Sequence, residues 1–162
     1  MSDGSGCSAV AGVRFVTSAG RRPAVDAVTE ILINIDVSDL EKAIDFYQSA
    51  AGLRLGRRLF DGTVAEMLGA SSSIYLLARQ PGSPAGSHVS QTRDYRRHWT
   101  PVHLDFVVED IDAAIDKALV AGAKLECEAR SFVWGCLATL SDPFGNGICF
   151  VQWQGRGYGE VA

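Results

Sequence analysis

The sequence predicts an α+β fold made of two βαβββ modules, whose mixed sheets form a concave cavity. Three observations carry this prediction. A strand-like run with a period of two leads directly into a capped helix, three shorter β-like runs follow, and the whole order recurs in the second half of the chain. With 162 residues and 47% hydrophobic content, the chain is long and apolar enough to bury a core.

The first module begins with an alternation of apolar and polar residues over 31–37, which is typical of a half-buried strand. Ser38 and Glu41 follow with capping-box spacing, apolar residues then recur at helical spacing, and Gly52 is a stop signal. These signals predict a helix over 39–51. Three further strands, separated by turn signals, are expected over residues 53–60, 63–68 and 72–79.

The second module repeats this order, with a strand over 102–108 and a helix over 109–123. The remaining strands are expected over residues 124–129, 132–140 and 147–153. At an offset of 71 residues, capping and core-facing positions of the first strand and helix are identical in the second half: Val108, Asp110, Ala114, Ile115, Asp116 and Ala121. The repeat therefore predicts a duplicated module.

The boundaries follow from composition. Residues 1–28 are rich in Gly, Ser and Ala, and we expect a tail that is mobile or only partly docked. The modules are expected over 29–80 and 101–155, and residues 156–162 form a C-terminal tail. The polar segment between the modules, residues 81–100, is longer than an ordinary connection, which indicates a linker or a functional lid.

Charge and cysteine usage exclude several classes of partner. A net charge of -4 and a pI near 5.3 argue against a nucleic acid or an anionic membrane as a partner. Four cysteines without paired spacing indicate free thiols in a reducing compartment, so we expect a cytoplasmic protein. The partner that remains is a small organic molecule.

The alternation also assigns faces to the first strand of each module. Its helix is expected to cover Ile33, Ile35 and Val37, or Leu104, Phe106 and Val108. The other sheet face stays free. Two free faces can be buried against one another or against an equivalent module, which leaves a concave space between them and makes a homodimer the expected assembly.

The paired segments NIDVSDLEKAIDFY and LDFVVEDIDAAIDKAL, with the closing turn and strand DPFGNGICFVQ, resemble the vicinal oxygen chelate superfamily. This superfamily includes glyoxalases, bleomycin resistance proteins and extradiol dioxygenases, and the resemblance covers residues 30–155. It implies two βαβββ modules around a cavity. One architecture hosts many chemistries, so the resemblance predicts the fold better than the activity.

In metal-dependent members of this superfamily, the ligands come from the first and last strand of each module. The resemblance places these positions at Leu32, Tyr75, His103 and Cys149. Leucine offers no donor, and Tyr75 and Cys149 stand where relatives carry glutamate, so only His103 is a good ligand. We expect no cofactor, because a divalent metal would need a nonstandard donor set drawn from residues such as Asp105, Cys136 or His98.

His103 shares strand parity with Asp105 and is expected to face the cavity as a general acid or base, or as a hydrogen-bond donor. The alternative is a buried imidazole satisfied by the backbone or by Asp105. Cys149 is either a nucleophile paired with His103 or a small buried residue. Tyr75 is expected to contribute a hydroxyl and an aromatic face to the ligand site, with Asn34 beside these anchors.

Trp134 and Phe60 are expected as walls of the ligand site, although either aromatic could serve only as core. Arg93, Arg96 and Arg97 form a cluster that either grips an anion or lies in a solvated turn or subunit contact. The glycines of DPFGNG are better explained by a tight turn than by a phosphate loop, since no helix follows them.

The sequence therefore favours a metal-independent protein that binds a small molecule and resembles the bleomycin-resistance-type members. The alternative is a lyase, isomerase or dioxygenase that uses His103 with a nonstandard metal set or with metal-free acid/base catalysis. A third class is a structural or regulatory subunit.

Overall fold

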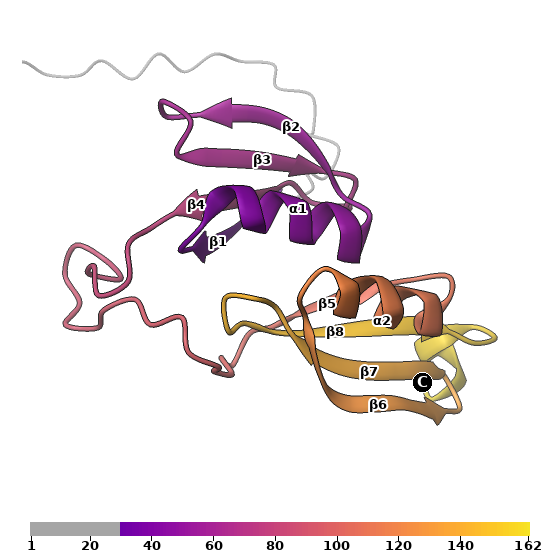
Figure 1. Cartoon of the computed structure of the whole chain (residues 1–162). Coiled ribbons are helices and arrows are strands. Elements are labelled where there is room, and N and C mark those ends of the chain that lie inside the picture. The colour runs from indigo at the N-terminus through magenta and orange to yellow at the C-terminus, as the bar shows by residue number, and fades with distance from the viewer. Residues whose placement is uncertain (1–29) are drawn as a thin grey trace, which may run out of the picture.

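A computed structural model describes residues 30–162, and the predicted N-terminal tail lies outside the described residues. Two four-stranded sheets and two α-helices follow the predicted order, so the α+β prediction of two βαβββ modules is confirmed (Figure 1). The first module comprises β1 (Ile33–Val37), α1 (Leu40–Ala51), β2 (Arg54–Leu59), β3 (Val64–Leu68) and β4 (Ile74–Ala78). The second comprises β5 (Leu104–Val107), α2 (Ile111–Val120), β6 (Lys124–Phe132), β7 (Gly135–Ser141) and β8 (Gly147–Trp153).

The two sheets have the same topology. Their strand orders are β1-β4-β3-β2 and β5-β8-β7-β6, and in each sheet the first strand runs parallel to the last one while the other neighbours are antiparallel. Each sheet is therefore mixed. The first strand of each module, β1 or β5, lies at a sheet edge.

Both helices are capped by an aspartate at the position that the repeat indicates, and the first helix does not use the predicted Ser38–Glu41 capping box. Asp39 accepts a hydrogen bond from the backbone N–H of Lys42 at 3.0 Å, and Asp110 accepts one from that of Ala113 at 2.9 Å. Ser38 is therefore not the cap, because the extended residue immediately before the helix is Asp39. α1 ends at Gly52, whose φ of 66° is the left-handed conformation that glycine adopts readily.

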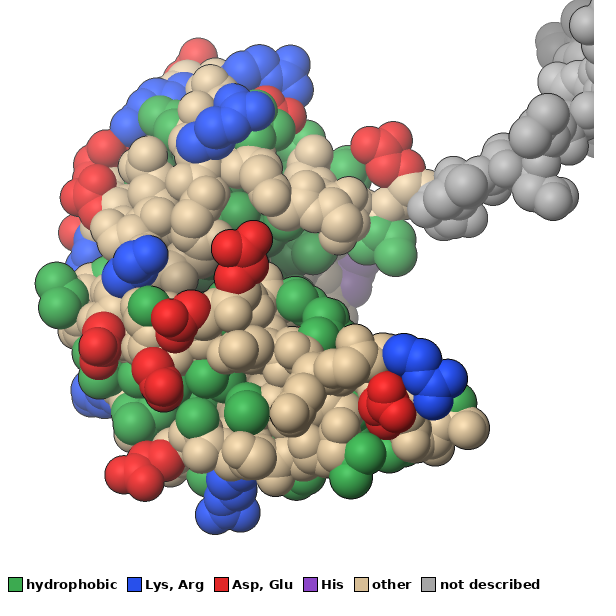
Figure 2. All heavy atoms as spheres, turned by 90° about the vertical axis from the view of Figure 1, so that its right-hand side faces the viewer, with side chains coloured by type: hydrophobic (Ala, Val, Ile, Leu, Met, Phe, Trp, Pro, Cys, Tyr) green, Lys and Arg blue, Asp and Glu red, His purple; other side chains and the backbone are tan. Residues whose placement is uncertain are grey.

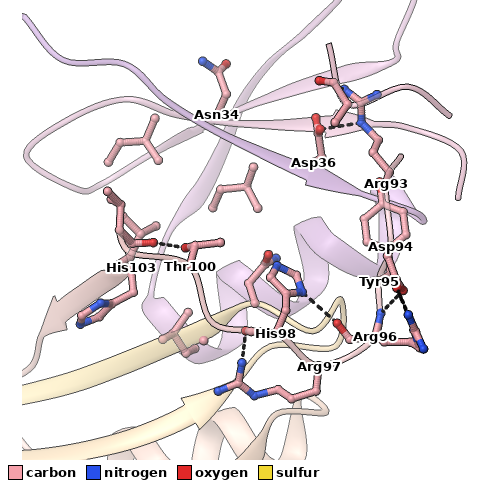
Figure 3. A pocket seen from close by; sticks show the side chains of 18 of the residues that line it. Asn34, Asp36, Arg93, Asp94, Tyr95, Arg96, Arg97, His98, Thr100 and His103 are labelled. Atoms are coloured by element: carbon pink, nitrogen blue, oxygen red, sulfur yellow. Dashed lines mark hydrogen bonds and ion pairs between the residues drawn. The ribbon is translucent and has the colours of Figure 1, made fainter. Parts of the chain in front are cut away.

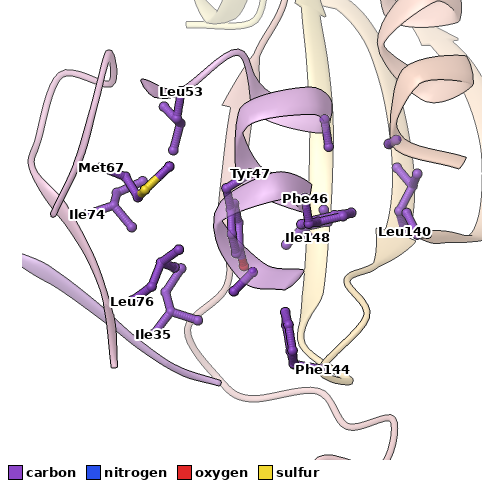
Figure 4. Close-up of a cluster of buried hydrophobic side chains, with 14 of the residues drawn as sticks. Ile35, Phe46, Tyr47, Leu53, Met67, Ile74, Leu76, Leu140, Phe144 and Ile148 are labelled. Atoms are coloured by element: carbon purple, nitrogen blue, oxygen red, sulfur yellow. The ribbon is translucent and has the colours of Figure 1, made fainter. Parts of the chain in front are cut away.

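The helices lie between the two sheets and touch each other (Figure 1). Side chains from both modules surround α1 and form one continuous core, which Figure 4 shows in part. Its largest fully buried members are Tyr47, Phe46, Phe144, Phe150 and Met67. Since each helix covers the inner face of its own sheet, the other sheet faces point away from the core. Within this chain, the two free faces do not close on one another.

A buried hydrogen bond joins the modules inside this core. The Tyr47 hydroxyl donates to Asp142 Oδ2 at 2.9 Å. Asp142 also accepts from the backbone N–H groups of Phe144 and Asn146, each at 2.8 Å, so its carboxylate organises the DPFGNG turn. Burial, together with the neighbouring Asp142 charge, raises the pKa of the Tyr47 phenol.

The connecting segment docks onto that turn. His98 N–H donates to the Gly145 carbonyl at 2.9 Å, and Trp99 covers Gly147 so closely that a Cβ there would lie 2.6 Å from the indole. Gly145 has a φ of +86°, as the predicted tight turn requires. The glycines therefore allow both the tight turn and the close packing of the connecting segment, through Trp99, against that turn.

Several boundaries differ from the prediction in the second module, where β5 and α2 are both shorter than expected. β6 continues to Phe132, which pairs with Gly135, so Trp134 lies in the turn between β6 and β7 rather than in a strand. Gly135 makes this pairing feasible, because a Cβ there would meet the Gln152 carbonyl oxygen at 2.3 Å. The C-terminal tail forms a short 3-10 helix, η1 (Gly157–Glu160). None of the helices in residues 30–162 has the length and hydropathy to span a bilayer.

Candidate functional site

The outward face of the second sheet carries the side chains that could act as acid, base, nucleophile or metal ligand: His103, Asp105 and Cys149. Strand alternation and the pairing of β5 with β8 place Asp105 beside Cys149 and Val107 beside Val151 on this face. Cys149 and Val151 are only 4% and 1% exposed although they point away from the core. Neighbouring side chains therefore cover both residues on this face.

Three polar side chains meet at one end of this face. His103 Nε2 lies 3.2 Å from Asp105 Oδ1, and the ligand atoms of His103, Asp105 and Cys149 all lie within 4.8 Å of one another. The Trp99 ring stands edge-on to the imidazole at a centroid distance of 5.3 Å. Asp105 is therefore the partner of His103, as one alternative expected. The imidazole is not buried, however, because the His103 side chain is 42% exposed.

Cys149 is a poor nucleophile in this setting. Burial raises the pKa of its thiol, and the adjacent Asp105 charge raises it further. The Thr139 hydroxyl lies 3.8 Å from the sulfur. At neutral pH the group is a thiol, so the geometry favours the reading of Cys149 as a small side chain in the floor of the face.

The outward face of the first sheet contains a separate cavity of about 560 Å³. Two of the predicted anchors, Asn34 and Tyr75, line it, and Phe60 stands at its rim in the turn after β2. The other lining residues are mostly apolar: Leu32, Leu59, Thr63, Val64, Leu77 and Arg79. Phe60 is 76% exposed, which makes it an outer wall rather than core.

An ion pair beside this cavity was not foreseen from the sequence. Arg57 forms two hydrogen bonds of 2.7 Å to Glu66, and the Tyr75 hydroxyl donates to the same carboxylate at 3.1 Å. The Arg57 guanidinium holds the pKa of Glu66 below its usual range. The one available signal was an acidic residue in the otherwise apolar run VAEML. Tyr75 therefore presents mainly its ring to the cavity, because its hydroxyl proton is engaged.

A second hollow, of about 1160 Å³, lies between the modules and the connecting segment (Figures 2 and 3). Asn34 and His103 both line it, and Figure 3 shows the arginine-bearing segment on one side and His103 on the other. Each arginine of the predicted cluster has an acidic partner: Arg93 pairs with Asp36, Arg96 with Asp94, and Arg97 with Glu126. These pairs neutralise the cluster and support the reading of a structural contact rather than an anion grip.

Within one chain the predicted site residues fall into two groups on the outward faces, although Asn34 and His103 also line the hollow between the modules. Asn34, Tyr75 and Phe60 line the first sheet face, and His103, Asp105 and Cys149 meet on the second. Trp134 joins neither group. It lies at the far end of the second sheet, where its ring contacts Phe132, Trp153 and Tyr158.

The donor chemistry does not fit the metal set of the superfamily. Leu32 has no donor and is 53% exposed just before β1, and Tyr75 is bonded to Glu66. The remaining pair, His103 and Cys149, lies on the other module, where Asp105 is a third donor within 4.8 Å, so this chain offers only a nonstandard set.

Comparisons with known proteins agree with this architecture. A family model described as a glyoxalase-like domain matches residues 32–151. TnmS3, an antibiotic binding protein from Streptomyces sp. CB03234, is 28% identical with a TM-score of 0.57, covering 80% of this chain and 98% of that one. A glyoxalase/bleomycin resistance protein from the same organism is 29% identical with a TM-score of 0.53, covering 76% and 100%.

A glyoxalase-related enzyme from Fulvimarina pelagi shares the fold at 15% identity, with a TM-score of 0.61 and coverage of 78% of this chain and 88% of that one. Among curated proteins, no match is found. The similar structures thus include a protein named for antibiotic binding and one named as an enzyme, so the choice between binding and catalysis depends on the site.

Proposed function

This chain belongs to the glyoxalase-like domain family, and we propose that it binds a small organic molecule on its outward sheet faces without a bound metal ion. One observation carries the proposal. On the second sheet, His103 and Asp105 lie 3.2 Å apart at one end of an outward face that is otherwise mostly apolar, with Val107 58% exposed. Apolar walls with a few convergent polar groups are the usual composition of a small-molecule site.

The polar pair gives such a face its orientation. A ligand with one hydrogen-bonding group would direct it toward His103 and Asp105 and rest its apolar body on the exposed Val107. A bound ligand would cover these half-exposed groups, so one that lacked a matching hydrogen-bonding group would leave them unpaired and would bind more weakly. The relative named as an antibiotic binding protein supports a binding function of this kind.

Metal independence is part of the proposal. It is supported by the donor-free Leu32 and by the engaged Tyr75 hydroxyl, which leave two of the four family positions without a metal ligand. A ligand would then be held by shape, stacking and hydrogen bonds alone.

We also propose that the chain works as a homodimer. Both β1 and β5 are edge strands with unpaired backbone groups, and exposed apolar side chains lie next to these edges: Ile31, Leu32, Val102 and Val107. A second copy that places its second module against the first module of this chain would cover both edges. It would also bring an Asn34 and Tyr75 face opposite a His103 and Asp105 face.

The proposal is tested by a thermal-shift screen of a panel of drug-like compounds against the chelator-treated protein. A compound that stabilises the wild type is expected to lose its shift in His103→Ala and to remain chemically unchanged. His88→Ala, which removes an exposed histidine in the connecting segment, is the matched control and should keep the full shift. Retention of the shift in His103→Ala would contradict the role of this residue.

The 3.2 Å contact between His103 and Asp105 favours a second candidate function. A carboxylate that orients an imidazole is a recurrent arrangement for general acid/base catalysis, so a metal-free isomerase or lyase is the alternative. Conversion of a stabilising compound by the wild type, but not by His103→Ala, would select this alternative over the binding function.

A further inference from the structure

Four aromatic rings form a wall at the far end of the second sheet, consisting of Phe132, Trp134, Trp153 and Tyr158. Phe132 and Trp134 are stacked with parallel planes, 2° apart, at a centroid distance of 4.9 Å. Tyr158 stands edge-on to Trp153 at 4.7 Å and lies 5.1 Å from Trp134. Three of the rings are well exposed: Phe132 at 43%, Trp153 at 40% and Tyr158 at 54%.

The end of β8 and the C-terminal tail supply two of the four rings, Trp153 and Tyr158. Gly157, with a φ of +60°, lies against the Trp153 ring and turns the chain so that Tyr158 returns to the indoles. Two contacts from Arg156 to Glu160 hold the turn: a backbone N–H bond of 2.9 Å and an ion pair. The family match ends at residue 151, so Trp153 and Tyr158 lie outside the part of the chain that the family model describes.

The wall shares a face with the polar pair. Strand alternation puts Cys149, Val151 and Trp153 on the outward side of β8, because Gln152, between the last two, points inward and accepts a hydrogen bond from the N–H of Ile111 in α2. Trp153 follows Cys149 by four steps along β8, a distance of about 13 Å. The face therefore runs from a hydrogen-bonding end at His103, over an apolar floor, to an aromatic end.

We propose that the aromatic wall is the subsite for a planar, fused-ring portion of the ligand, whose hydrogen-bonding group reaches His103 and Asp105. This inference rests on the proposed binding function and specifies its ligand class. Stacked and edge-to-face contacts stabilise an aromatic ring beyond the area that it buries, whereas a saturated ring gains only the area. An elongated aromatic molecule matches both ends of the face.

The test uses two probes of the same outline, a hydroxyanthracene with its hydroxyl on an end ring and its fully saturated counterpart. Binding is followed by calorimetry, and quenching of tryptophan fluorescence reports contact with the wall. Phe132→Leu and Tyr158→Leu replace exposed rings by aliphatic groups and leave the sheet intact. Val133→Ala is the matched control, because Val133 is 71% exposed in the same turn and carries no ring.

The wild type is expected to bind the aromatic probe more tightly than the saturated one and to show quenching. Each ring variant should weaken the aromatic probe by about two- to tenfold, with the saturated probe unchanged and Val133→Ala like the wild type. His103→Ala should weaken both probes equally, because both carry the hydroxyl.

Three outcomes overturn the subsite. Equal weakening of both probes would mean that the wall supplies only area, and unchanged aromatic binding in both ring variants would mean that the ligand does not reach it. Dissociation of a dimer by either ring variant, measured by sedimentation, would assign the wall to contact with a second copy. In each of these cases, the proposed binding function still holds if a compound stabilises the wild type but not His103→Ala. If no compound shows this dependence on His103, both the binding function and the aromatic subsite are contradicted.

Discussion

Tyr47 and Asp142 show how one polar contact can tie two modules together. Their hydrogen bond of 2.9 Å is buried in the core between α1 and the turn before β8. The sequence does not indicate this contact, because the two residues are 95 positions apart. A lone tyrosine on an apolar helix face looks like ordinary core until the carboxylate is placed beside it.

We expect Tyr47→Phe to lower the free energy of unfolding by about 2 kcal/mol at pH 7, because it removes a buried hydrogen bond to a charged acceptor. Burial raises the pKa of the Tyr47 phenol, so its stabilising contribution is complete below the unfolded value of about 10 and is lost as the pH rises through the higher folded value. The variant should therefore lose less stability above pH 10 than the wild type. Urea unfolding measures both effects.

Tyr158→Phe is the control for this experiment, since the Tyr158 side chain is 54% exposed. It should match the wild type at pH 7. An unchanged unfolding free energy in Tyr47→Phe would show that the hydrogen bond between the modules does not stabilise the fold.

At the scale of elements, the local signals determine most of the fold. β8 is observed over Gly147–Trp153, as its apolar run predicts, and α1 ends one residue before its glycine stop. The features that sequence reasoning missed depend on contacts between distant residues. The Arg57–Glu66 pair needs the register of β2 on β3, and the turn position of Trp134 needs the pairing of Phe132 with Gly135. The local alternation of apolar and polar residues does not determine either strand register.

The connecting segment provides a test at this scale. Gly147→Ala places a methyl group in the space of the Trp99 indole, so we expect Trp99 to leave its seat and residues 81–100 to become more accessible. Limited proteolysis of this segment should accelerate several-fold, with a change in tryptophan fluorescence. Gly86→Ala in the same segment meets only the tip of Val89 and should behave like the wild type. Equal proteolysis rates for the two variants would contradict the claim that the packing of Trp99 on Gly147 holds the connecting segment in place.

At the scale of the whole molecule, the placement of the helices decides where a ligand can bind. The repeat in the sequence predicts two sheets with one free face each, but it leaves open whether those faces meet within the chain. Because α1 and α2 pack between the sheets, the two outward faces, one with Tyr75 and one with Asp105, lie on opposite sides of the core, while Asn34 and His103 share the hollow between the modules. The proposed dimer would bring the two outward faces together.

Native mass spectrometry of the assembled protein with a stabilising compound tests the central claim most directly, because one spectrum counts chains, ligand and metal ions together. The account predicts two chains with intact organic ligand and no added metal mass, and the ligand peak should disappear in His103→Ala. A metal ion retained at each site, or a ligand whose mass has changed to that of a product, would contradict it.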